Sequence, residues 1–272
     1  MNKVLIHFAL SLAVLLATQR LHATPENLDA NTIASAYKKE QIIAYFDEKG
    51  NLADQHSQAY YHRKFLGKTP EGYYLLQNFY QKPAVKQSEP FTVRAESDFT
   101  LWVAETIEGK YTRWHKSGQK QEESLFINQS AEEFWTLWYK NGQKWIVGKL
   151  KNGKEIGPWV IWYENGQKKS EGAYLNAKRE GLWTVWDENG VKIIKGHFKN
   201  GEKDQLWTFW HENGQKQEEG HYKNDEPIGL WTFWHQNGQK WKEEFYQTGE
   251  PPKTTYFNKQ GTPASNPAFE IK

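Results

Sequence analysis

The side chains best suited to chemistry in this sequence are nine histidines and a set of regularly spaced glutamates. His211 and His235 stand 24 residues apart, and so do His197 and His221. If that spacing spans two β-strands, the members of a pair are separated by roughly 9.6 Å. Two histidines on one zinc ion must each hold a nitrogen about 2.0 to 2.1 Å from the metal. We therefore expect no metal site.

Catalytic motifs are missing as well. The sequence has no Gly-x-Ser-x-Gly, no His-Glu-x-x-His, no phosphate-binding glycine loop, and no cysteine to serve as nucleophile, thiolate ligand or disulfide partner. Glu164, Glu188 and Glu212 recur at the same place in successive repeats. A carboxylate in every unit favours a solvated turn residue over a catalytic acid. We predict a protein that is not an enzyme and needs no cofactor.

Tryptophan is the remaining candidate for function, because indole rings stack on sugars and anchor protein interfaces. Six of the 14 tryptophans recur every 24 residues: Trp114, Trp138, Trp162, Trp186, Trp210 and Trp234. We treat these six as a candidate binding ladder for a glycan or a partner protein. The alternative is a structural role, in which rings such as Trp138 with Trp145, and Trp234 with Trp241, pack across strands.

A second tryptophan column and a glycine column keep the same period, so the element that positions the ladder is a 24-residue repeat. The columns are Trp135, Trp159, Trp183, Trp207, Trp231 and Gly142, Gly166, Gly190, Gly214, Gly238. Within a unit, aromatic and β-branched residues precede an Asn-Gly pair, and a second stretch follows it. This order predicts strand, turn, strand, because Asn and Gly tolerate the positive φ of a tight hairpin turn. The link to the next hairpin, such as 151–157, is predicted to be looser.

The Asn-Gly pair, taken as two loop residues, predicts the register. Trp210 then faces Gln217, and Trp207 faces and covers Gly220. Since side chains alternate between the faces of a strand, Trp207 lies on a first face and Trp210 on a second. We expect the first face to be the core, because it also carries the column Arg113, Leu137, Ile161, Val185, Phe209 and Phe233.

The sequence therefore predicts an all-β chain. Its main part is an elongated meander, or solenoid, of antiparallel β-hairpins, and a divergent N-terminal β region precedes it. We expect a signal peptide over residues 1–23, the divergent region over 24–96, the array over 97–250, and a degenerate cap and tail over 251–272. Residues 45–51 and 257–261 each look like a turn of the array style.

The N-terminus has the layout of a secretory signal peptide. Lys3 precedes an apolar stretch over residues 4–16, and a short polar segment ends at Ala23. The apolar stretch is shorter than the roughly 20 residues of a membrane-spanning helix, and nothing later is apolar enough to span. We expect cleavage after Ala23 or Ala17, and export to the periplasm, the cell envelope or the outside.

The charge of the mature chain is balanced. Cleavage removes Lys3 and Arg20 from the 35 basic residues, which leaves 33 against 33 acidic residues. A chain without net charge exerts no global field on nucleic acid or anionic lipid. We therefore expect neither nucleic-acid binding nor insertion into a membrane.

The repeat unit resembles a known family. The pattern Trp-x-x-Trp/Tyr-x-x-Asn-Gly-Gln-Lys-x-x-x-Gly-x-Tyr-x-Asn-Gly, seen over 159–181 and 207–225, resembles the MORN-repeat variant of bacteria. The resemblance covers about residues 97–250, and residues 45–50 with 59–61 are similar to the leader of such proteins. It implies an exported member of the antitoxin-like MORN-repeat family. The export signal departs from what a cytoplasmic antitoxin would carry.

Three functions remain open at this level. The leading hypothesis is an exported scaffold that presents its sheet to an unidentified protein partner. The alternative is a carbohydrate or cell-wall binding module, because Trp-rich hairpins also resemble, more distantly, the choline-binding and glucan-binding repeats of surface proteins. A third is an antitoxin-like or membrane-surface role, which the family name implies through its association with membranes.

Overall fold

The computed structural model of the protein describes residues 37–53, 58–102, 106–128 and 130–264. They form two compact units: a first unit from residues up to 85 together with 92–106, and an array from 86–91 and 107 onward. The predicted signal peptide, residues 1–23, lies outside the described residues. No helix in the described part of the chain is long and apolar enough to cross a membrane.

The first unit contains an antiparallel sheet of three strands, β1 (Gln41–Phe46), β2 (Tyr61–Lys68) and β3 (Tyr74–Tyr80). Arg63 of β2 is fully buried. Its guanidinium donates to the Asn78 side chain at 2.7 Å and to the Leu101 carbonyl at 2.6 Å, as a buried charge requires. The turn predicted over 45–51 is confirmed, because the Gly50 amide donates to the Asp47 carbonyl at 3.1 Å.

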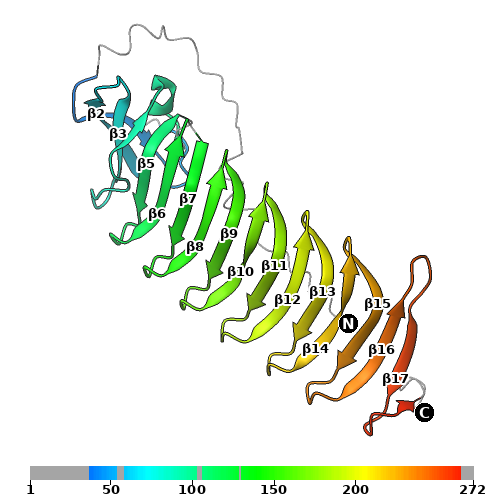
Figure 1. Ribbon diagram of the computed structural model, residues 1–272. Helices are drawn as coiled ribbons and strands as arrows, with labels where there is room; N and C mark the ends of the chain where they lie inside the picture. Colours follow the sequence, from blue (N-terminus) through cyan, green and yellow to red (C-terminus); the bar gives the residue numbers. More distant parts are fainter. Residues whose placement is uncertain (1–36, 54–57, 103–105, 129, 265–272) are drawn as a thin grey trace. The chain divides into compact units, whose positions relative to one another are not determined.

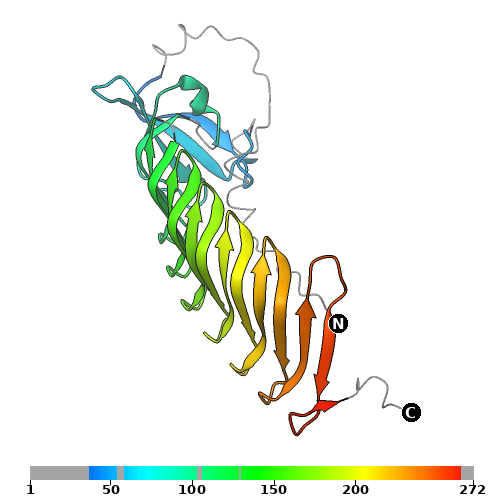
Figure 2. The same cartoon turned by 45° about the vertical axis from the view of Figure 1, so that its right-hand side comes forward.

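The array is an antiparallel meander, as the 24-residue period predicts. Each strand pairs with the one before it and the one after it, and the hairpins lie side by side in sequence order (Figures 1 and 2). We expected the array to begin near residue 97; its first hairpin strand begins at Ile107. The strands are β5 (Ile107–Trp114), β6 (Lys120–Ile127), β7 (Ser130–Trp138), β8 (Lys144–Lys151), β9 (Lys154–Trp162), β10 (Lys168–Leu175), β11 (Lys178–Trp186), β12 (Lys192–Lys199), β13 (Glu202–Trp210), β14 (Lys216–Lys223), β15 (Glu226–Trp234), β16 (Lys240–Tyr246), β17 (Lys253–Phe257) and β18 (Pro263–Ala264).

The two kinds of connection are the reverse of the prediction. The link between β8 and β9, predicted to be loose, is a tight turn in which Lys151 pairs with Lys154. Its two central residues, Asn152 and Gly153, both have positive φ, as a type I′ turn requires. Asn recurs with positive φ at the start of the equivalent turns, at Asn176, Asn200 and Asn224.

The Asn-Gly pair of the sequence motif forms a longer loop instead. In the turn after β13, the His211 amide donates to the Gln215 carbonyl at 2.8 Å, and only Gly214 takes positive φ, at 82°. Residues 212–214 therefore form a three-residue loop, the arrangement in which a type I turn ends on a left-handed residue. Asn213 is suited to it by hydrogen bonding: its side chain accepts from the Gln215 amide at 3.1 Å and donates to the Gln236 carbonyl at 2.6 Å.

The register agrees with the prediction in the strand and departs from it at the loop. Trp207 pairs with Gly220, as predicted. Trp210 pairs with Lys216 and not with Gln217, because the register shifts by a β-bulge after Phe209. The three-residue loop shifts the pairing next to it by one residue, and the bulge at Gln217 restores the register that a two-residue loop would have given.

The ring of Trp207 lies over Gly196 of the preceding strand, so the prediction that it covers Gly220 is wrong. A Cβ added to Gly196 would collide with the indole ring. The ring leans this way because its Nε1 donates to the His197 carbonyl at 3.0 Å. A bulge between Gly196 and His197 disturbs the ladder there, and the indole hydrogen bond supplies a partner for that carbonyl. The same bond joins Trp159 to Lys149, Trp183 to Ala173 and Trp231 to His221.

These tryptophans form the core of the array on what we call the aromatic face. Trp159, Trp183, Trp207 and Trp231 are at most 6% exposed. They alternate edge-to-face with Tyr174, Phe198 and Tyr222, and neighbouring ring centroids are 4.9 to 6.2 Å apart. A single sheet can bury this much aromatic surface because each ring is covered by its neighbours along the array.

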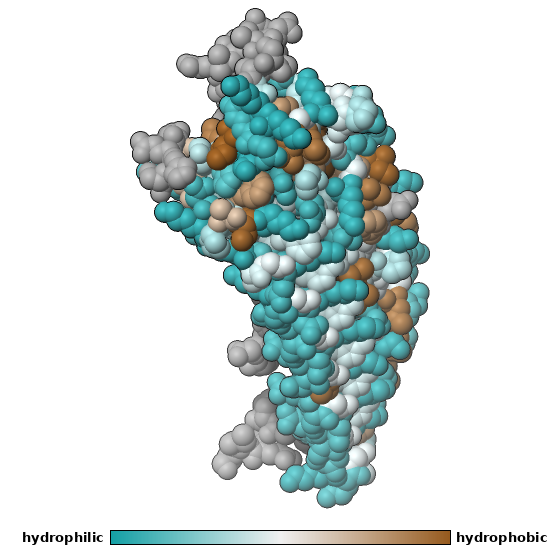
Figure 3. Space-filling model, turned by 90° about the vertical axis from the view of Figure 1, so that its left-hand side faces the viewer, coloured by the Kyte–Doolittle hydropathy of each residue, from teal (hydrophilic) through white to brown (hydrophobic). Residues whose placement is uncertain are grey.

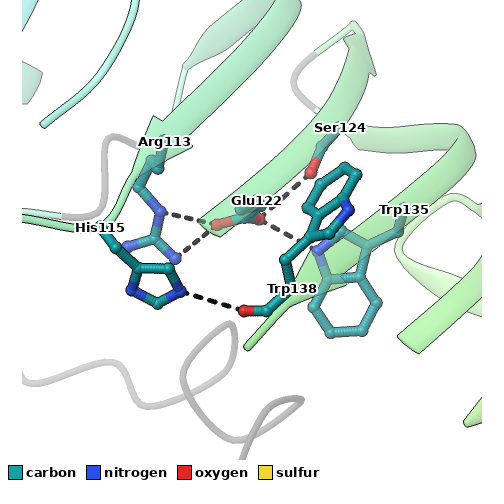
Figure 4. A network of polar contacts seen from close by, with 6 residues as sticks. All are labelled: Arg113, His115, Glu122, Ser124, Trp135 and Trp138. Carbon is teal, nitrogen blue, oxygen red and sulfur yellow. Dashed lines mark hydrogen bonds and ion pairs between the residues drawn. The ribbon is translucent and has the colours of Figure 1, made fainter. Parts of the chain in front are cut away.

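The first hairpin replaces apolar packing with a polar network (Figure 4). Ser124 occupies the position that glycine holds in the next four hairpins, opposite Trp135. The Trp135 indole donates to the Glu122 carboxylate at 3.0 Å, and that carboxylate also accepts from Arg113 Nε at 2.7 Å and from Ser124 Oγ at 3.1 Å. Terminal repeats that differ from the rest are expected where an array must end.

Candidate interaction surface

The six tryptophans of the candidate ladder lie opposite the aromatic face, on what we call the ladder face. All six are half-buried. The rings share this environment because a lysine ammonium lies over most of them, 4.6 to 5.9 Å from the ring centroid. These pairs are Lys86 with Trp114, Lys120 with Trp138, Lys168 with Trp186, Lys192 with Trp210, and Lys216 with Trp234.

Most of the covering lysines are also held by a carboxylate three residues later. Lys216 pairs with Glu219 at 2.7 Å, and Glu219 accepts a further hydrogen bond from Thr208 at 2.9 Å. The pairs Lys120 with Glu123, Lys168 with Glu171, and Lys240 with Glu243 repeat the arrangement. Four of the six ladder rings, Trp114, Trp138, Trp186 and Trp234, therefore lie beneath a lysine that is paired with a glutamate, which leaves only part of the indole open to solvent.

The predicted tryptophan pairs are replaced by other aromatic contacts. Trp145 packs against Tyr139 with 5.7 Å between centroids, and Trp241 packs against His235 at 5.8 Å. The cause is the bulge after each three-residue loop, which takes Trp145 and Trp241 out of the ordinary alternation of the strand.

The histidine column links successive hairpins. His211 Nε2 lies 3.0 Å from the Trp234 carbonyl, in the next hairpin, and His115 Nε2 lies 3.1 Å from the Trp138 carbonyl. Tyr139 holds the equivalent position after β7, and its hydroxyl donates to the Trp162 carbonyl of the next hairpin at 2.8 Å. In the described parts of the chain, no group of three or more His, Asp or Glu side chains is placed to hold a metal ion.

A row of exposed apolar side chains is a candidate feature that the sequence analysis missed. Leu182, Leu206 and Leu230 lie on the ladder face and are 43%, 42% and 50% exposed. Phe134 holds the same position in an earlier hairpin, and we call these four residues the apolar row. In the described array, the other exposed large hydrophobic side chains lie on this face too: Ile127, Leu175, Ile228 and Phe245.

The signal for the apolar row was present in the sequence. Each member immediately precedes a tryptophan of the aromatic face, so strand alternation turns it to the opposite face. Figure 3 shows one side of the molecule, where hydrophobic residues form separate patches among hydrophilic ones. The regular row of exposed apolar side chains makes this face a candidate interaction surface.

The aromatic face, in contrast, is closed. Burial raises the pKa of Tyr174 and of Tyr222 to about 12. Burial also raises the pKa of Glu218, against the opposing influence of Lys242 and Lys203. Raised pKa values caused by burial are typical of side chains packed into a core.

The predicted tryptophan and glycine columns lie in different parts of each hairpin: the tryptophans in the strands and the glycines in the loops. Trp159, Trp183, Trp207 and Trp231 form the buried column, and Trp135 of β7, whose indole donates to Glu122 of the first hairpin, is only half-buried. The five glycines, Gly142, Gly166, Gly190, Gly214 and Gly238, close the three-residue loops with φ between 80° and 86°.

The fold and this surface define a class: a single-sheet β-hairpin repeat protein with one packed and one exposed face. The family described as MORN repeat variant matches residues 107–128, 155–176, 179–200, 206–224 and 227–248. The protein is therefore a MORN-repeat protein across the array. No curated protein matches the chain.

Proposed function

We propose that the protein is an exported, non-enzymatic repeat scaffold that binds a partner protein through the ladder face. The observation that carries this function is the apolar row. Its leucines stand one hairpin apart, at roughly 9.6 Å, and point away from the closed aromatic face. An apolar centre surrounded by a polar rim is the usual arrangement of a protein interface.

A glycan is the weaker candidate for this face. Sugar rings stack on an open indole face, whereas a lysine ammonium already lies 5.5 Å from the centroid of Trp210. The leucines of the apolar row supply hydrophobic contact without the flat ring that a sugar needs. The row therefore favours a protein.

The apolar row can be tested by protein capture from envelope extracts. The mature protein is compared with a triple variant, Leu182→Ser, Leu206→Ser and Leu230→Ser, which should fold because the same column also holds Lys110 and Pro158. The matched control carries Ile42→Ser, Leu52→Ser and Val85→Ser, three exposed apolar positions outside the array.

We expect the proteins enriched by the wild type to fall at least about tenfold with the apolar-row variant and to persist with the control, because anchors dominate such interfaces. Equal capture by both variants would remove the apolar row from the binding surface. Binding to a glycan array that is lost in Trp210→Ala but kept in the leucine variant would overturn the protein assignment in favour of a carbohydrate.

Export rests on the N-terminal sequence and has its own test. Mass spectrometry of the mature protein should find a new N-terminus near Thr24 or Thr18. An intact Met1 in a soluble cytoplasmic pool would contradict export and leave the binding surface unaffected.

A further inference from the structure

The balanced net charge of the chain conceals a strongly basic zone on the ladder face. From β8 to β12 this face carries nine exposed lysines against two acids, Glu171 and Glu180. Glu164 and Glu188 lie in the three-residue loops, and Asp187 lies directly before one of these loops, so none of the three is on a strand. We call these lysines the basic zone: Lys144, Lys149, Lys151, Lys154, Lys168, Lys178, Lys192, Lys195 and Lys199.

Part of this charge lacks the internal compensation found elsewhere in the array. Four hairpins place a glutamate three residues after the covering lysine, and the pair at Lys168 and Glu171 is one of them. The equivalent positions after Lys144 and Lys192 hold Val147 and Lys195, whose side chains can neither accept a hydrogen bond from an ammonium group nor neutralise its charge. These two hairpins therefore present lysine where the others present an ion pair.

A second departure lies at the turn between β8 and β9. Lys151 pairs directly with Lys154, and like charges placed opposite each other destabilise a sheet. The equivalent pairs further on are Leu175 with Lys178, Lys199 with Glu202 and Lys223 with Glu226, and none of them places like charges opposite each other. Among these turns, the β8 to β9 turn alone has two like charges opposite each other, and an external anion would relieve their repulsion.

We propose that the basic zone binds an extended acidic segment of the partner protein. This proposal rests on the proposed function and adds the chemistry of the partner. Carboxylates of the segment pair with Lys195, Lys199 and the lysines around the β8 to β9 turn, and apolar side chains contact Leu175 and Leu182. Leu175 and Leu182 are 54% and 43% exposed beside the zone.

The hairpin period selects the backbone conformation of the segment. Successive hairpins are roughly 9.6 Å apart, and one turn of polyproline II covers three residues in about 9.3 Å. A segment in this conformation brings every third side chain to the same place on successive hairpins. An α-helix, with a pitch of about 5.4 Å, does not match this spacing.

The test uses the mature protein and a fluorescent fifteen-residue peptide of five Glu-Pro-Pro units. The zone variant, Val147→Glu with Lys195→Glu, restores the array pattern by giving Lys144 and Lys192 the glutamate that other hairpins have. The control, Lys140→Glu with Gln236→Glu, makes the same charge change in three-residue loops, at positions where Glu164 and Glu212 already occur. Both variants are therefore compatible with the fold.

We expect anisotropy titrations at low salt to show binding that weakens about tenfold in the zone variant and less than about twofold in the control, since only the former loses lysines that meet the ligand. The peptide with lysine in place of glutamate should not bind. Equal affinities for the two variants would overturn the proposal, and so would no binding of the acidic peptide at all.

Two further probes test whether the basic zone binds a polyanion other than an acidic protein. Suppose that phosphatidylglycerol vesicles or single-stranded DNA bind the wild type, bind the zone variant about tenfold more weakly, and that the acidic peptide does not bind. The ligand of the basic zone would then be a lipid or a nucleic acid, and the proposal of an acidic protein would be overturned. The proposed function is judged separately, by the leucine variant. Capture that depends on the apolar row but not on Val147→Glu with Lys195→Glu would refute the acidic partner and leave the scaffold function standing.

Discussion

Gly196→Ala tests the packing on which the array depends, because it adds one methyl group where the indole of Trp207 lies. The backbone of Gly196 does not have positive φ, so alanine meets no conformational strain there. Its Cβ would fall within the Trp207 ring. Since the ring also donates to the His197 carbonyl, it cannot move away without breaking that bond at 3.0 Å.

The magnitude follows from three contributions. Overpacking a core typically costs about 1 to 3 kcal/mol, and loss of the indole hydrogen bond costs about 1 kcal/mol. Replacing glycine in a strand returns about 0.5 to 1 kcal/mol. We expect Gly196→Ala to lower the free energy of unfolding by about 2 kcal/mol.

Urea unfolding, followed by circular dichroism, measures this in the wild type and in a Trp207→Ala background. Without the ring, the added methyl group should be neutral or stabilising by about 0.5 to 1 kcal/mol. Lys195→Ala, on the other face of the same strand, serves as control and should stay within about 0.5 kcal/mol of wild type. An equal cost of Gly196→Ala in both backgrounds would show that the ring does not cover this glycine.

Three further predictions concern the loops, the two faces and the tyrosines. Gly214→Val should destabilise the array more than Gln215→Val, because Gly214 has a φ of 82° that a β-branched residue resists; equal melting temperatures would refute this. Trp207→Ala should cost roughly 3 to 5 kcal/mol and Trp210→Ala less, since only the first ring is fully buried; equal losses in urea would show that both faces are packed alike. Burial raises the pKa of Tyr174 to about 12, so its contribution to the free energy of unfolding is complete below about pH 10 and declines as the pH rises toward 12. A urea midpoint that is constant from pH 9 to 12 would contradict that burial.

The sequence by itself determined the hairpin array, its period and the assignment of residues to faces. Trp207 and Trp210 are three residues apart, so strand alternation alone places them on opposite faces. The pairing of Trp207 with Gly220 also followed from counting along the hairpin. These features are local, because each depends only on residues of one repeat and on the geometry of a strand.

The loop types required the structure, because Asn-Gly is compatible with more than one turn. Both connections contain an asparagine, and only the backbone shows positive φ at Asn152 and not at Asn213. Whether Trp207 leans over Gly196 or Gly220 was equally undetermined, since the two glycines flank it symmetrically in the register. The indole hydrogen bond to the bulge at His197 decided the direction.

The exposure of side chains on the proposed interaction surface became clear only from the tertiary structure. Net charge is a sum over the chain, and it gave no indication that lysines from five strands converge on one face. The apolar row likewise became visible only when burial separated Leu206, which is 42% exposed, from Trp207, which is 4% exposed. Local pattern fixes which way a side chain points, but what lies beside it depends on strands 24 residues away, and those neighbours determine whether it is covered.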